Sequence, residues 1–182
     1  YGGNETLERL QRRDARFFNT CMMATALGAA ISDGLDDGRV VSGVGGQYNF
    51  VAMAHALPKA RSMLLLRASR DEHGRQVSNI RWNYGHTTIA RHLRDIYVTE
   101  YGIADLRGKV DEDVIVAMCG IADVRDQAAL VEAGKRGLKL DEGFDAPAAW
   151  ARNTAARVRE ALAPPCDRLR LRQEPSSGPA AR

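Results

Sequence analysis

The chain has 182 residues, of which 45% are hydrophobic and 27% are charged, and its formal net charge is +3. This composition is typical of a soluble globular domain and excludes a disordered or fibrous chain. A chain of this length buries a core without help from a disulfide or a metal, and so small a net charge gives no sign of nucleic-acid binding.

The cysteines and the longest apolar stretch indicate in which cellular compartment the chain is expected. The three cysteines, Cys21, Cys119 and Cys166, are an odd number at wide spacing, which argues against a disulfide framework or a zinc site and predicts a reducing, cytoplasmic setting. The longest apolar stretch, residues 17–31, is too short to span a bilayer, so no membrane association is expected. Because the chain starts at Tyr1 without a Met, we expect it to be part of a longer protein.

The first third of the chain predicts a helix, a strand pair and a second helix. Asn4 can cap a short helix that carries Leu7 and Leu10 on one face. Residues 17–32 lack a clear period and are interpreted as a buried strand or strand pair around Gly28. A further strand at Val40–Val41 is expected to lead through a glycine-rich turn into a helix that stops at Pro58. The apolar side of that helix is predicted to hold Phe50, Met53, Ala54 and Leu57.

The middle of the chain predicts strands. Residues 62–66 have the pattern of a fully buried strand, residues 71–74 form a turn, and 77–82 and 96–99 are further strand candidates. Strands that alternate with helical segments favour an α/β layer fold.

Three helices are predicted in the last part of the chain. Acidic residues at 111–113 mark the start of the first, with an apolar stripe at Val114, Ala117, Met118 and Ile121. The second begins near Asp123, turns Val124, Ala128 and Val131 inward, and ends at 135–137. The third spans 148–163 and stops at Pro164–Pro165. The domain is therefore expected to cover residues 1–162, followed by a mobile Pro/Ser/Arg-rich tail at 163–182.

The glycine-rich segment Ser42-Gly43-Val44-Gly45-Gly46-Gln47 is the strongest local signal for function. Glycine lets backbone N–H groups converge, and the helix that follows adds its positive end, so the turn can hold a phosphate or a developing oxyanion. It is not a Walker A loop, since no Gly-Lys-Ser/Thr follows, and it departs from G-x-G-x-x-G. An ordinary tight turn between strand and helix is an equally good interpretation of the spacing.

Two other polar residues are candidates for chemistry. Glu100 directly follows a predicted strand, where α/β proteins commonly place reactive groups, although an ion pair with Arg91, Arg94 or Arg107 explains it as well. Asn19 lies in an apolar run and needs hydrogen-bond partners if it is buried. His86 and His92 lack metal-ligand spacing, so no metal site is predicted.

Taken together, the segments SGVGGQYNFVAMA and VTEYGIADLRGK, followed by a helix ending near IADVR, resemble the C-terminal domain of the acetyl-CoA hydrolase/CoA-transferase family over about residues 17–135. That family includes 4-hydroxybutyrate and succinyl-CoA:acetate CoA-transferases. The resemblance implies an α/β fold with an open, mainly parallel sheet flanked by helices, of the CoA-transferase (NagB/RpiA-like) type.

The resemblance also implies a reaction, in which CoA moves between an acyl-CoA thioester and a carboxylic acid or water through a glutamyl-CoA intermediate. Coenzyme A is a substrate there, and no permanently bound cofactor is implied. By resemblance the Gly45–Gly46 turn supplies an oxyanion-hole donor, and Gly43, Val44 and Gln47 help to seat CoA. Asn19 is implied to contact the acyl or pantetheine end, and Glu100 to be an active-site carboxylate.

The resemblance further implies an N-terminal half of the same enzyme that carries the nucleophilic glutamate, and a homodimer as an assembly. Asn49 stands where most members have Asp, Leu93 stands about where an Asp is usual, and the family's His-Pro is absent. The hydrolase and transferase activities are not distinguished by these residues. Two other interpretations stay open, which are a non-catalytic CoA- or nucleotide-binding module and an assembly domain.

Overall fold

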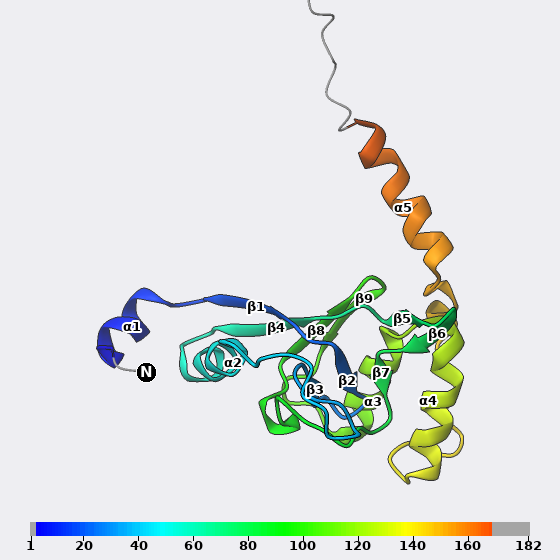
Figure 1. Ribbon diagram of the computed structural model, residues 1–182, viewed down its shortest axis with the longest axis horizontal. Coiled ribbons are helices and arrows are strands. Elements are labelled where there is room, and N and C mark those ends of the chain that lie inside the picture. The colour runs from blue at the N-terminus through cyan, green and yellow to red at the C-terminus, as the bar shows by residue number, and fades with distance from the viewer. Residues whose placement is uncertain (1–2, 169–182) are drawn as a thin grey trace, which may run out of the picture.

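A four-stranded sheet is the centre of the molecule, and the computed structural model describes residues 3–168 (Figure 1). Its strand order is β1 (Arg16–Thr20), β4 (Arg61–Leu65), β8 (Ile96–Thr99) and β9 (Gly102–Asp105). β1, β4 and β8 run parallel, and β9 returns antiparallel to β8. The predicted α/β architecture with an open, mainly parallel sheet is confirmed.

Two smaller strand groups accompany the sheet. β2 (Met23–Thr25) pairs with β3 (Ala30–Ile31) and with β7 (Ile80–Arg81), while β5 (Ser69–Glu72) and β6 (Arg75–Ser78) form a hairpin. The predicted strand pair around Gly28 is confirmed, and Gly28 has the positive φ of 83° that a tight turn requires. The turn predicted at 71–74 connects the hairpin, although β5 extends into the first two residues of that range.

The positions of the helices agree with the sequence predictions better than the sides that the helices bury. α1 (Glu5–Gln11) is capped by the side chain of Asn4, as expected, and α3 (Asp111–Gly120) and α4 (Val124–Arg136) begin where the acidic residues predict. In α2 (Gln47–Ala56), however, Phe50 is exposed and the buried residues are Gln47, Val51 and Ala54. The predicted inward face is confirmed at Ala54 and Leu57 and wrong at Phe50, because the helix turns Gln47 and Val51 toward the sheet instead.

Three further expectations are corrected. Val40 and Val41 form no strand beyond an isolated bridge to Gly34, and both side chains are exposed. Ala128 of α4 is exposed, and the buried residues there are Gln127, Leu130 and Gly134. The third predicted helix is split into η2 (Ala148–Arg152), a 3₁₀ turn, and α5 (Ala155–Arg168), because Asn153 turns inward between them.

α5 extends away from the sheet (Figure 1) and continues through Pro164–Pro165, where two backbone N–H donors are missing, so the predicted stop there is wrong. The predicted tail begins within this helix, and its remainder, residues 169–182, lies outside the described residues. The domain boundary at residue 162 stays a prediction.

One face of the sheet is buried and the other is open. α2 and α3 cover the face that carries Leu64, Tyr97 and Ala104, all almost fully buried. On the opposite face the strand registers align Phe18, Met63 and Ile96 in one row, and Leu65, Val98 and Ile103 in another. Phe18 is 63% exposed and Ile103 is 70% exposed, so an apolar layer is left uncovered by the described part of the chain.

Candidate functional site

The parallel strands β1, β4 and β8 end at the same edge of the sheet, where open α/β sheets commonly bind ligands. A cavity of about 630 Å³ lies at this edge and is called the strand-end cavity. Its walls are formed by residues that end or follow these strands, together with one residue next to β7: Thr20, Cys21, Met22, Leu65, Leu66, Arg67, Asn79, Val98, Thr99 and Glu100.

Glu100 occupies the turn between β8 and β9 and lines the strand-end cavity. One carboxylate oxygen, Oε2, accepts the backbone N–H of Ala68 at 2.9 Å, which joins the turn to the segment after β4. The ion pairs that could have explained Glu100 are not formed. Arg91 and Arg94 contact Asp111 instead, and Arg107 contacts Asp105 and Asp95.

The turn that carries Glu100 is held by the buried carboxylate of Asp123, which the sequence indicated only as the start of a helix. Asp123 is 1% exposed and accepts the Tyr101 hydroxyl at 2.7 Å. The Nε and Nη2 atoms of Arg125 each donate to it at 2.7 Å. These bonds, those from Arg125 foremost, lower the pKa of Asp123 from 3.8 to about 2. Burial, and then the bond to Asp123, raise the pKa of Tyr101 above its ordinary value.

The glycine-rich turn is exposed and ends directly at α2. Gly46 is the N-cap residue of α2 and has no side chain to cap it, while Gly45 has a φ of +57° with open space around it. Within residues 3–168, no hydrogen bond uses the N–H groups of Gly45 or Gly46. The turn therefore presents free donors at the positive end of a helix, which is an arrangement suited to an anionic oxygen.

A second cavity, of about 380 Å³, adjoins this turn and is called the glycine-turn cavity. It brings together five of the seven residues that the sequence singled out: Asn19, Gly43, Val44, Gly46 and Gln47. Gly45 is not among its lining residues, and Glu100 lies in the strand-end cavity. Both cavities share Thr20, Cys21 and Met22 as a common wall, so they are neighbours along the sheet edge.

Gln47 connects the turn to the sheet. Its Nε2 donates to the backbone carbonyl of Thr20 at 2.9 Å, and its side chain is buried at the start of α2. The same cavity is lined by Ser32 from the loop after β3, which no sequence motif indicated. Ser32 is 13 positions from Asn19 in the sequence, so only the fold places the two in one wall.

Cys21, Cys119 and His86 add no reactive centre. Burial raises the pKa of Cys21 and of Cys119 to about 12, which leaves both as protonated thiols, as small core residues are expected to be. His86 contacts Asp33 at 3.0 Å and is held as a partnered surface side chain. No group of three or more His, Cys, Asp or Glu residues within 3–168 is arranged to hold a metal ion.

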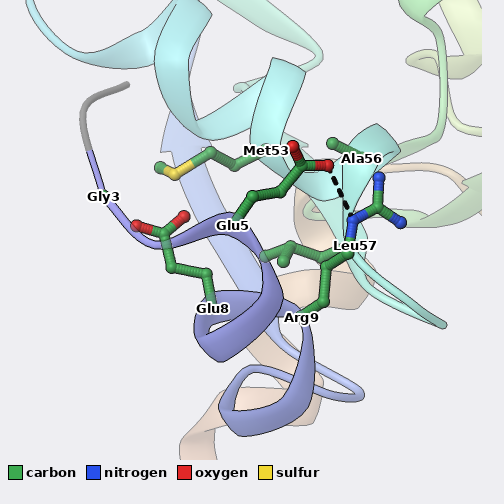
Figure 2. A pocket seen from close by; sticks show the side chains of 7 residues that line it. All are labelled: Gly3, Glu5, Glu8, Arg9, Met53, Ala56 and Leu57. Carbon is green, nitrogen blue, oxygen red and sulfur yellow. Dashed lines mark hydrogen bonds and ion pairs between the residues drawn. The ribbon is translucent and has the colours of Figure 1, made fainter.

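A hollow of about 310 Å³ lies between α1 and α2, lined by Glu5, Arg9, Met53 and their neighbours (Figure 2). It contains none of the predicted site residues, and its Glu5–Arg9 ion pair at 2.9 Å is exposed. No helix within residues 3–168 has the length and apolar character required to cross a membrane.

Comparison with known proteins yields one family and a set of solved structures. Residues 3–134 match the model of the acetyl-CoA hydrolase/transferase C-terminal domain. RipA from Yersinia pestis has a similar structure, with a TM-score of 0.65 and 23% identity over 75% of this chain and 30% of RipA. A 4-hydroxybutyrate CoA-transferase from Porphyromonas gingivalis follows with a TM-score of 0.52 and 24% identity over 67% of this chain and 26% of that protein.

The chain thus spans less than a third of the length of these two structures, and at identities below 25% the similarity shows the fold alone. No protein of curated function matches the chain.

Proposed function

The chain belongs to the family of acetyl-CoA hydrolase/transferase C-terminal domains, and from this premise we propose that it contributes the carbonyl-binding turn and part of the CoA site of an acyl-CoA hydrolase or CoA-transferase. The nucleophile of this enzyme is a glutamate in an N-terminal half that precedes the residues described here. The substrates are an acyl-CoA and a small carboxylic acid or water, and CoA is a substrate rather than a resident cofactor.

The proposed reaction exchanges one thioester for another. The glutamate carboxylate attacks the thioester carbonyl, the CoA thiolate leaves, and an acyl-glutamyl anhydride forms. The thiolate then attacks the glutamyl carbonyl, which releases the acid and leaves a glutamyl-CoA thioester. The incoming acid reverses these steps with its own acyl group, or water hydrolyses the intermediate. Each attack passes through a tetrahedral oxyanion that requires hydrogen-bond donors.

The free N–H groups of Gly45 and Gly46 are the observation that carries this proposal. They lie at the N-terminus of α2, where the helix dipole adds to their positive field, and no group in residues 3–168 occupies them. A preorganised donor of this kind typically accelerates acyl transfer about 100- to 1,000-fold. Gly43, Val44 and Gln47 then line the path of the CoA arm, and Asn19 contacts its acyl or pantetheine end.

Glu100 is proposed as the active-site carboxylate that positions the reacting groups. The N–H of Ala68 holds one of its oxygens, which leaves the other available at the strand-end cavity. The two cavities share Thr20, Cys21 and Met22 as a wall, which supports a site that combines this carboxylate with the glycine turn. A carboxylate so placed can orient the incoming acid or activate a water for hydrolysis.

The uncovered face of the sheet supports a partner layer. Phe18 and Ile103 are mostly exposed there, and such an apolar layer is stabilised when another part of the protein covers it. We assign this covering layer to the N-terminal half, so a second copy in a homodimer would bind at another surface.

Two alternative functions make different predictions. A non-catalytic CoA-binding module would bind CoA without turnover even when the N-terminal half is restored, and an assembly domain would not bind CoA.

Intact-mass spectrometry after incubation with acetyl-CoA, with and without borohydride, tests this division of labour. The chain is expected to remain unmodified because its partner half carries the nucleophile. A covalent adduct of the mass of CoA would place the nucleophile in this chain and contradict the proposal. Glu100→Gln would then identify it, because an adduct on Glu100 disappears in this variant and an adduct elsewhere persists.

A further inference from the structure

The walls of the glycine-turn cavity contain three buried polar atoms that have no hydrogen-bond partner within residues 3–168. They are Asn19 Nδ2, Ser32 Oγ and Gln47 Oε1. Buried polar atoms are almost always paired in folded proteins, because an unpaired one retains the cost of losing its water. Three in the wall of one cavity indicate that a ligand group supplies the missing partners.

The geometry of Gln47 fixes what this ligand group must offer. Because Nε2 donates to the Thr20 carbonyl, Oε1 is the end of the amide that is left without a partner. The residue is 6% exposed, so bulk water does not satisfy this oxygen. An oxygen acceptor requires an N–H or O–H donor from the ligand. The Ser32 hydroxyl and the Asn19 amide nitrogen, in turn, can donate to an acceptor on the same group.

The composition of the cavity disfavours the other chemical classes. Its lining holds no charged side chain, so beyond the N–H groups of the glycine turn nothing replaces the hydration that a carboxylate would lose. A carboxylate would also direct its lone pairs at Gln47 Oε1, which repels them. An alkyl chain would leave all three polar atoms unpaired. A neutral group with both a donor hydrogen and an acceptor oxygen satisfies them.

We infer that the glycine-turn cavity binds a neutral alcohol or secondary amide of the substrate, and that Ser32 and Gln47 determine this specificity. The inference rests on the proposed function, since that function supplies an acyl-CoA at the glycine turn. Two parts of such a substrate carry this chemistry, namely a hydroxyl on the acyl group and the amides of the pantetheine arm. The three atoms are shielded from water, so ligand entry includes rotation of the side chains.

Nuclear magnetic resonance titrations of the whole chain with three S-acyl-pantetheines test the inference. The probes carry a butyryl group, a butyryl group with a terminal hydroxyl, or a succinyl group, and all share the same amides. If the acyl hydroxyl occupies the cavity, the hydroxybutyryl probe binds about tenfold more tightly than the other two, and Ser32→Ala removes the difference. If a pantetheine amide occupies it, all three bind alike and Ser32→Ala weakens all three by about tenfold.

Ser62→Ala is the matched control, because the Ser62 hydroxyl is likewise buried without a partner within residues 3–168 but lines neither cavity. Ser62→Ala is expected to leave all three affinities unchanged. Ser32→Ala is expected to fold with an unchanged or higher Tm, since it removes an unpaired buried hydroxyl.

Two results would overturn the inference, and they are distinguishable. If the butyryl or succinyl probe binds most tightly, or if Ser32→Ala changes no affinity, the inference fails while the proposed CoA site survives. If no probe shifts the backbone signals of residues 43–47, the inference and the proposed function fail together.

Discussion

Asp123→Ala is expected to lower the free energy of unfolding by about 2–4 kcal/mol, as measured by urea denaturation. The substitution removes the acceptor of the Tyr101 hydroxyl, of the Arg125 guanidinium and of the Arg125 backbone N–H at the start of α4. Arg125 is 52% exposed and regains water, so the ion pair itself contributes the smaller part of the loss. The partly buried Tyr101 bond and the lost helix cap contribute most of it.

Glu132→Ala, an exposed carboxylate on the same helix, is the control and should change the free energy of unfolding by less than about 0.5 kcal/mol. An Asp123→Ala variant as stable as this control would contradict the assignment of Asp123 as the anchor of the Glu100 turn. Asp123→Asn keeps an acceptor oxygen and is expected to fall between the two.

The same carboxylate predicts a dependence of stability on pH. Folding lowers the pKa of Asp123 from 3.8 to about 2, so the ionised form is favoured in the folded state. Its contribution is fully present above the ordinary pKa and is lost as the pH falls through 3.8 toward 2. The difference in unfolding free energy between the native chain and Asp123→Asn should therefore shrink across this range.

The second large effect is expected at Glu100 in the enzyme that this chain forms with the proposed N-terminal half. Glu100→Gln keeps an oxygen for the Ala68 N–H but removes the charge, and it should slow acyl-CoA hydrolysis or transfer about 100-fold or more. Initial rates of CoA release measure it. Glu72→Gln, on the β5–β6 hairpin, is the control and should retain full activity. Full activity in Glu100→Gln would leave Glu100 with a structural role alone.

Local sequence signals predicted where helices begin, but not which residues they bury. Asn4 and Asp123 accept the backbone N–H bonds that cap α1 and α4, and such caps depend on neighbouring residues only. Burial depends on what packs against the helix. Gln47 is inward in α2 because its amide reaches the Thr20 carbonyl across the fold, a contact that hydrophobic periodicity cannot predict.

The strands show the same limit. β9 was not predicted, because Gly102–Asp105 is short and becomes a strand only by pairing with β8. Val40 and Val41 have high strand propensity but find no partner beyond one isolated bridge.

The candidate site was predicted in part. The glycine turn and Gln47 are consecutive in the sequence, and a recognisable pattern therefore exists for them. Asn19 joins them in one cavity, whereas Glu100 lies in the neighbouring one. Ser32 was missed because it reaches the cavity wall from a different element than the glycine turn. The Tyr101–Asp123 bond was missed because it connects two separate elements, and neither feature has a local sequence signature.

The most direct test of the central claim is whether the N–H groups of Gly45 and Gly46 bind the thioester carbonyl. In nitrogen-15 correlation spectra of the chain, acetyl-CoA is expected to move both amide protons further downfield than free CoA does, because free CoA lacks the carbonyl. Gly45→Ala should weaken this response, because its φ of +57° disfavours a side chain, while Gly74→Ala, with a φ of +78° in a distant turn, should not. Equal shifts with free CoA, or no shift at Gly45 and Gly46, would contradict the account.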